Sequence, residues 1–180
     1  LDGVSRPVPS PFFAIATQNP VEYQGTFPLP EAQMDRFALA FSLGYPDETE
    51  ELEMLARLSA PVATEELLPC ITPAEVAAIQ QQCAAVRVEA SVRQYLLALV
   101  RATREHPDIT LGVSPRGTVA FQKAAQAWAF LSDRDYVLPD DIKALAPHVL
   151  AHRLIPAGGH RATTLVADLL ETLPIPEWQG

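Results

Sequence analysis

Two short apolar runs near the start of the chain have the pattern of strands that are buried on both faces. They cover residues 12–17 and 38–43. Continuous apolar runs of this length are typical of parallel sheets, whose two faces are both covered by helices. Between them, residues 21–30 carry glycine and prolines and predict a loop, while residues 31–37 predict a short helix with an acidic first turn. This order indicates an α/β unit whose other strands lie upstream. Without those strands, the first 45 residues should be only partly ordered.

Helical periodicity replaces the strand pattern from about residue 46 onward. Residues 72–75 combine an N-cap threonine, a proline at the first helical position and the glutamate of a capping box. A second helix is predicted by apolar residues at the positions i, i+3, i+4, i+7 and i+8 of an amphipathic helix, which are Val92, Tyr95, Leu96, Leu99 and Val100. The predicted helices cover residues 47–58, 72–86, 92–106, 115–131, 139–153 and 161–173. Residues 46–173 should therefore pack as a small helical bundle.

The helix predicted over residues 115–131 should pack beside the amphipathic helix through Phe121, Ala125 and Trp128, which share one face. The predicted fold is therefore mostly α. A small α/β part covers residues 1–45, and an all-helical domain covers residues 46–180.

Charge and composition narrow the class of protein. The chain has 22 acidic and 13 basic side chains and a net charge of -9, which argues against nucleic-acid binding through a basic surface. No apolar run approaches the roughly 20 residues of a membrane span, and the start of the chain is neither a secretory signal nor an initiator methionine. We therefore expect a cytoplasmic protein without a membrane span, cut from a longer one.

Several catalytic motifs are absent from the sequence. No stretch matches GxxxxGK[ST], the loop that holds the phosphates of a nucleotide, and no apolar strand ends in Asp-Glu. His148 and His152 are four residues apart but lack the glutamate of an HExxH motif, which favours a core or surface pair over a metal site. Cys70 and Cys83 do not form a CxxC pair. The sequence thus predicts no metal ligands.

Two polar residues in the first part of the chain could carry chemistry. Asn19 follows the first predicted strand, at the edge of a sheet where α/β proteins bind their ligands. It could equally be the turn residue of an Asn-Pro pair. Arg36 lies at the end of the short predicted helix, where a cation also complements the helix dipole. Neither residue decides the function by itself.

Arg116 is the more informative residue. Ser114 as N-cap and Pro115 at the first helical position place Arg116 and Gly117 in the first turn of a helix. A cation opposes the dipole there and a glycine weakens the helix, at a cost of roughly 0.3 to 1 kcal/mol each. A helix N-terminus with an added arginine favours an anion such as phosphate. The alternative is an exposed arginine that the loop edge tolerates.

Four segments in the same order resemble the MoxR family of AAA+ ATPases. They are residues 13–22 (FAIATQNPVE), 25–37 (GTFPLPEAQMDRF), 44–46 (GYP) and 114–117 (SPRG). The resemblance therefore spans essentially the whole chain. Gly117 stands where the family usually has alanine, a departure that leaves the role of the preceding arginine intact.

The resemblance implies a role for each candidate residue. Asn19 looks like sensor 1, which helps to orient the water that attacks the γ-phosphate. Arg36 looks like the arginine finger, which reaches into the nucleotide site of a neighbouring subunit. Arg116 looks like sensor 2, carried on the AAA+ lid, which reports loss of the γ-phosphate. By the same comparison, the phosphate-binding loop and the Mg²⁺ ligands lie upstream, so this chain alone should not hydrolyse ATP.

For the whole protein, the resemblance implies a Mg²⁺-dependent ATPase that forms a homo-oligomeric, hexameric ring. Family members act as chaperones that assemble partner proteins or load them with metal, and the partner often has a von Willebrand factor A-type domain. Three alternatives stay open: a non-catalytic helical interaction module, a magnesium-chelatase-like AAA+ subunit, and a DNA-remodelling helicase, against which the acidic charge weighs.

Overall fold

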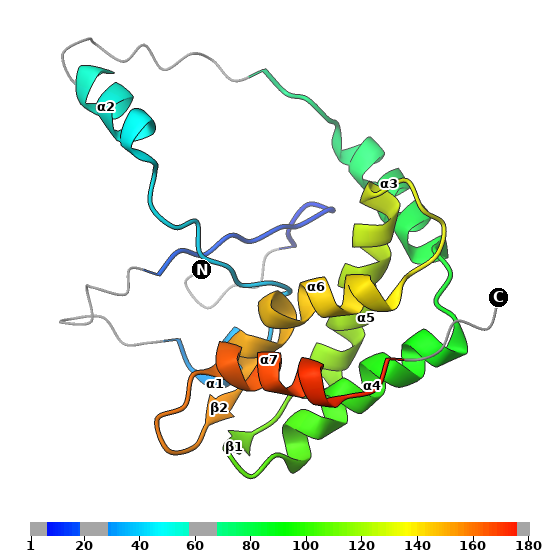
Figure 1. Ribbon diagram of the computed structural model, residues 1–180. Helices are drawn as coiled ribbons and strands as arrows, with labels where there is room; N and C mark the ends of the chain where they lie inside the picture. The colour runs from blue at the N-terminus through cyan, green and yellow to red at the C-terminus, as the bar shows by residue number, and fades with distance from the viewer. Residues whose placement is uncertain (1–6, 19–28, 58–67, 176–180) are drawn as a thin grey trace.

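The computed structural model describes residues 7–18, 29–57 and 68–175 (Figure 1). Its helices are α1 (Glu31–Met34), α2 (Glu48–Arg57), α3 (Pro73–Ala85), α4 (Ala90–Glu105), α5 (Pro115–Leu131), α6 (Pro139–Leu150), the 3-10 turn η1 (Ala151–Arg153) and α7 (Ala162–Thr172). Two short strands, β1 (Ile109–Leu111) and β2 (Ile155–Pro156), complete the described elements. The fold is mostly α, as the sequence predicts.

Helix starts follow the capping residues that the sequence places there. At α3, the Thr72 hydroxyl accepts a hydrogen bond from the backbone N–H of Glu75 at 3.2 Å. In return, Glu75 Oε2 accepts one from the backbone N–H of Thr72 at 2.7 Å. These bonds satisfy two of the free N–H groups at the helix start, which confirms the predicted capping box.

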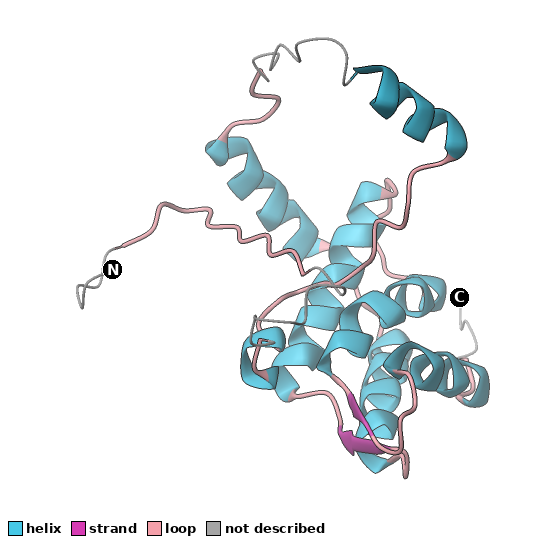
Figure 2. Cartoon of the chain, turned by 90° about the vertical axis from the view of Figure 1, so that its left-hand side faces the viewer, coloured by secondary structure: helices cyan, strands magenta, loops and turns pink. Residues whose placement is uncertain are grey.

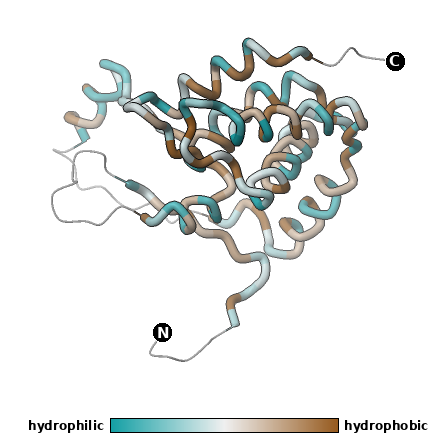
Figure 3. Tube along the Cα trace, turned by 90° about the horizontal axis from the view of Figure 1, so that it is seen from below, coloured by the Kyte–Doolittle hydropathy of each residue, from teal (hydrophilic) through white to brown (hydrophobic). Residues whose placement is uncertain are grey.

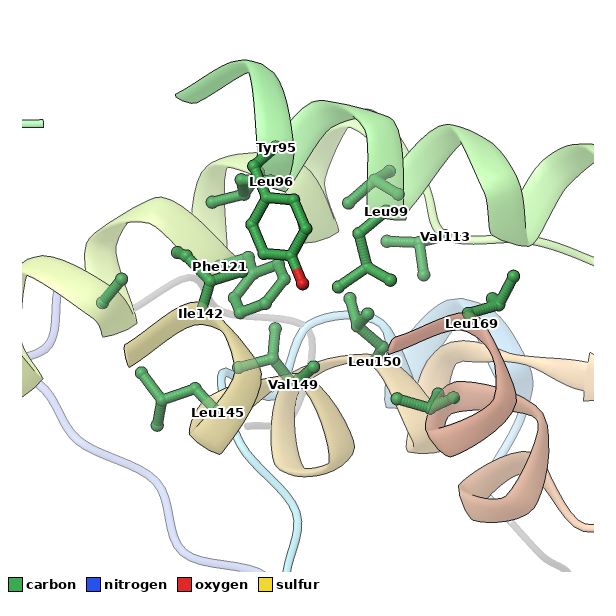
Figure 4. Packing of buried hydrophobic residues seen from close by; sticks show 14 of the residues in the cluster. Tyr95, Leu96, Leu99, Val113, Phe121, Ile142, Leu145, Val149, Leu150 and Leu169 are labelled. Atoms are coloured by element: carbon green, nitrogen blue, oxygen red, sulfur yellow. The ribbon is translucent and has the colours of Figure 1, made fainter. Parts of the chain in front are cut away.

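The hydrophobic core lies between α4, α5, α6 and α7 (Figure 4). All five residues of the predicted stripe on α4 are buried, and α5 contributes Phe121 and Ala125. Trp128 is 46% exposed, so its predicted place in the core is wrong. It lies seven positions after Phe121, and seven residues are 20° short of two full turns, so the drift alone does not explain its exposure. The buried positions near this end of α5 are instead Ala125 and Ala129, so the covered face of the helix passes beside Trp128 and not through it.

A small antiparallel sheet lies inside the helical domain. Strand β1 pairs with β2 through Ile109 and Pro156 and through Leu111 and Ile155. The sequence analysis missed this sheet and predicted an all-helical domain, because two or three residues carry no detectable alternation. The sheet connects the chain that leaves α4 to the chain that leaves η1, and it therefore brings η1 close to the start of α5.

The two strands predicted near the start of the chain are not formed. Residues 12–17 and 38–43 are extended but pair with no strand among the described residues. Phe13 is 83% exposed and Leu43 is 92% exposed. A strand of a parallel sheet needs neighbouring strands and helices on both faces. The described part of the chain pairs no strand with these runs, and the Ala40 N–H instead donates to the His148 carbonyl of α6 at 2.9 Å. Figure 2 shows the first segment as a long loop that leads away from the helices.

Helix α2 also departs from the predicted bundle. It stands apart from the other helices in two perpendicular views (Figures 1 and 2), and none of its residues is buried. The helix carries glutamates at positions 48, 50, 51 and 53, and its large apolar residues Leu52, Met54 and Leu55 are about 60% exposed. Figure 3 shows that polar and apolar positions also alternate along the tubes of the other helices of the chain. Leu52 and Leu55 lie three positions apart and share one side of the helix, but no described element covers that side.

Candidate functional site

The first turn of α5 carries Arg116 on its surface. Ser114 is the N-cap, and its hydroxyl oxygen accepts a hydrogen bond from the backbone N–H of Gly117 at 3.1 Å. Pro115 occupies the first helical position, as predicted. The Arg116 side chain is exposed and forms no hydrogen bond or ion pair with any described residue. A free guanidinium beside a helix N-terminus can bind an anion such as phosphate.

Helix α4 fixes the chain that enters this turn. The buried Thr103 hydroxyl donates to the Val100 carbonyl at 2.6 Å and accepts from the Val113 N–H at 3.1 Å. Arg104 Nε donates to the Val113 carbonyl at 2.8 Å. Gly112 passes so close that a Cβ there would lie 2.7 Å from the Arg104 Cα and from the Thr103 carbonyl oxygen. The position of Arg116 is therefore set by a rigid connection to α4.

The segment that carries Arg36 lies directly against the start of α5. Asp35, the residue that follows α1, accepts a hydrogen bond from the Ser114 hydroxyl, which is 2.9 Å from each carboxylate oxygen. Arg36 comes next in the chain, and its side chain is exposed and has no hydrogen-bond or ion-pair partner among the described residues. The structure thus brings the Arg36 segment and the Arg116 segment together through one hydrogen-bonded contact.

Arg153 of η1 lies beneath this contact. Its side chain is 1% exposed, and Nε lies 3.3 Å from Asp35 Oδ1, an ion pair without the alignment of a hydrogen bond. The guanidinium also donates to the carbonyls of Asp35 (3.4 Å), Ala38 (3.3 Å), Phe37 and Val149. Burial lowers the pKa of Arg153, and the Asp35 carboxylate opposes this shift. A buried cation is tolerated only with such partners.

His152 forms a second link between η1 and the Arg36 segment. Its Nε2 lies 3.1 Å from the Phe37 carbonyl oxygen, which requires the proton on this nitrogen. Burial lowers the pKa of His152, and the bond to Phe37 only partly offsets that shift. His148, its neighbour one turn earlier, is exposed. The pair therefore does not converge on one point, and His152 acts as a donor to the backbone.

Sequence reasoning missed the residues that join the two arginines. Asp35 and Arg153 are 118 positions apart, so no local pattern connects them. One signal was present, since Asp35 lies at the C-terminal end of α1, where an acidic side chain opposes the helix dipole unless another group compensates it. The third predicted residue, Asn19, lies outside the described residues.

Comparison with known proteins places these segments in a family. Residues 101–171 match the AAA lid domain, and residues 1–39 match the ATPase family associated with various cellular activities (AAA). The chaperone MoxR1 of Mycobacterium tuberculosis is 35% identical over 86% of this chain and 43% of its own length. The chain belongs to the MoxR family of AAA+ ATPases.

Two further relatives also match nearly the whole chain and a little over half of their own length. The uncharacterized protein YeaC of Bacillus subtilis is 44% identical over 98% of this chain and 57% of its own length. A crystal structure of a proposed ATPase from Cytophaga hutchinsonii matches with a TM-score of 0.85 and 34% identity, over 96% of this chain and 56% of that one. This MoxR-family chain thus spans about half the length of the relatives it matches.

The candidate residues fall within the matched regions of the MoxR-family chain. Arg36 lies in the part that matches the AAA family, and Arg116 and Arg153 lie in the part that matches the lid domain. Among the described helices, none is both long enough and apolar enough to cross a membrane.

Proposed function

We propose that this chain is the sensing portion of an ATPase, in which residues 1–45 complete an α/β core and residues 46–180 form its lid. The observation that carries this proposal is a pair of exposed cations, Arg36 and Arg116, neither of which has a partner among the described residues. Their segments are joined by partly buried polar contacts. Exposed cations are common, but a buried ion pair that positions their backbones is costly and needs a reason.

Arg116 and the first turn of α5 suit the terminal phosphate of ATP. The helix start presents the positive end of its dipole, and Arg116 adds a planar donor that can pair with two phosphate oxygens. The N–H groups of Gly117 and Thr118 are already bonded to Ser114, so the guanidinium is the main donor for an anion. Bound ATP supplies the phosphoryl group that is transferred to water. In this role Arg116 is sensor 2, whose contact with the γ-phosphate holds the lid in one position.

Arg36 and Asn19 have the other two proposed roles. Arg36 is the arginine finger, which stabilises negative charge in the nucleotide site of a neighbouring subunit, and Asn19 is sensor 1, which orients the attacking water. The first role requires an oligomer, and we propose the hexameric ring. By the family resemblance, we propose that the Mg²⁺ ligands and the phosphate-binding loop belong to a part of the protein upstream of these residues.

We further propose that the whole protein acts as a chaperone in the assembly or metal loading of partner proteins, with a von Willebrand factor A-type domain as the candidate partner. The naming of the relative MoxR1 as a chaperone supports this proposal. Loss of copurification with such a domain after ATP depletion would be its first indication.

The experiment that tests the ATPase proposal uses the full-length protein with Arg36→Ala. An arginine finger contributes about 10³-fold or more to the rate, so the variant should lose nearly all steady-state hydrolysis. Arg101→Ala is the matched control, because Arg101 is an exposed arginine paired only with Glu105 on the surface of α4. If Arg36→Ala hydrolyses ATP as fast as Arg101→Ala, the finger assignment is wrong and a non-catalytic interaction module becomes the better explanation.

A further inference from the structure

Three side chains from three distant parts of the sequence form one polar joint. They are Asp35 after α1, Ser114 before α5 and Arg153 in η1, and we call them the Asp35 joint. Asp35 receives the Ser114 hydroxyl on one side and the Arg153 guanidinium on the other. The joint bonds the Arg36 segment to both α5 and η1, whereas His152 bonds that segment to η1 alone.

The Ser114 side of the joint connects directly to the turn that carries Arg116. A hydroxyl has one proton to donate and two lone pairs to accept with. Ser114 Oγ therefore accepts the Gly117 N–H at 3.1 Å while it donates to Asp35 at 2.9 Å. These two bonds connect the first turn of α5 directly to Asp35.

The Arg153 side of the joint fixes the backbone around Arg36. Its guanidinium donates to the carbonyl of the residue before Arg36 and to the carbonyls of the two residues after it. The same side chain packs under α5, since a Cβ on Gly117 would lie 3.0 Å from Arg153 Cδ. Arg153 thus contacts both the segment that presents Arg36 and the turn that presents Arg116.

From this geometry we infer that the Asp35 joint couples two nucleotide sites. The inference rests on the proposed function, in which Arg116 contacts the ATP of its own subunit and Arg36 serves the ATP of the neighbour. Displacement of the α5 turn when the γ-phosphate is lost must then shift or break the joint and move Arg36. Asp35, Ser114 and Arg153 are positioning residues, and their coupling makes hydrolysis cooperative around the ring.

The test compares Ser114→Gly with Ser114→Thr in the full-length protein. Glycine is nearly as good an N-cap as serine, so it preserves the helix start but removes the hydroxyl that binds Asp35. Threonine keeps the hydroxyl and is the matched control. The measurements are the Hill coefficient of ATP hydrolysis, the affinity for a fluorescent ATP analogue and the melting temperature.

The coupling role predicts that Ser114→Gly lowers the Hill coefficient to about 1, with analogue affinity within about twofold of the parent, while Ser114→Thr keeps the parent's Hill coefficient. A purely structural role would lower the melting temperature without that change. An active parent that is not cooperative, or a Ser114→Gly protein with the parent's Hill coefficient, overturns the coupling alone. A parent that does not hydrolyse ATP, or an Arg36→Ala variant as active as the parent, overturns the proposed function and the coupling with it.

Discussion

The bundle around α4 to α7 and the segments before α2 both contain runs of apolar residues, but only those of the bundle are buried. In the bundle, Leu99, Phe121 and Val166 are fully buried, whereas Phe13 and Leu43 in the early segments are more than four-fifths exposed. The difference lies in the partners. The helices of the bundle pack their apolar faces against one another. The early apolar runs have no strand or helix packed against them in this way among the described residues. Apolar pattern alone therefore does not determine burial, because the neighbouring elements must also be present.

The largest test of this contrast replaces one phenylalanine in each region of this chain. Phe121→Ala should lower the free energy of unfolding by about 3–5 kcal/mol, because it removes a fully buried ring and leaves a cavity. Phe13→Ala should change it by less than about 0.5 kcal/mol, since that ring is 83% exposed. Urea denaturation measures both. Equal effects would show that the early segment packs as tightly as the bundle.

A smaller effect is expected at Gly112, where the bundle allows no side chain. Gly112→Ala should cost about 1–3 kcal/mol, because its Cβ would overlap backbone atoms of Thr103 and Arg104, which cannot rotate away. Thermal melting measures the loss. Gly44→Ala, at a position with open space but a φ of 73°, is the comparison outside the bundle and should cost about 1 kcal/mol through strain alone.

The free energy of unfolding should depend on pH through His152, which bonds the bundle to the segment around Phe37. Burial lowers its pKa below the ordinary value of about 6.5, so the unfolded chain binds more protons than the folded one as the pH falls. Stability is then fully present above pH 6.5 and falls below it, by at most about 1.4 kcal/mol per pH unit from this group. Urea titrations from pH 7.5 to about 5 measure the slope. His152→Gln should flatten it, and an unchanged slope would remove His152 as the cause.

The smallest expected effect lies inside the core. The Tyr95 hydroxyl is buried and has no hydrogen-bond partner among the described residues, and Figure 4 shows it pointing between the core side chains. Tyr95→Phe removes an unsatisfied polar group and should raise stability by up to about 1 kcal/mol or leave it unchanged. A clear loss of stability in a melting experiment would mean that the hydroxyl has a partner after all.

Local rules predicted the helices because their determinants lie within a few residues. The capping box at Thr72 and Glu75 and the apolar stripe of α4 are sequence features that tertiary structure did not override. The exposed positions of Arg36 and Arg116 were also consistent with their sequence context. Their roles remain predictions.

Other features depend on contacts that no local pattern contains. The pairing of β1 with β2 and the Asp35 joint connect residues that are tens of positions apart. The prediction of strands over residues 12–17 and 38–43 was wrong for a related reason, because a strand forms only when a neighbouring strand pairs with its backbone. The burial of Arg153 could not be foreseen either, since an arginine at the end of a helix is usually exposed.

The most direct test is a structure of the full-length assembly bound to a non-hydrolysable ATP analogue. We expect the Arg116 guanidinium to lie about 3 Å from a γ-phosphate oxygen of its own subunit, and Arg36 to reach the γ-phosphate bound by the next subunit. An assembly in which Arg116 faces solvent and Arg36 is remote from every nucleotide would contradict this expectation.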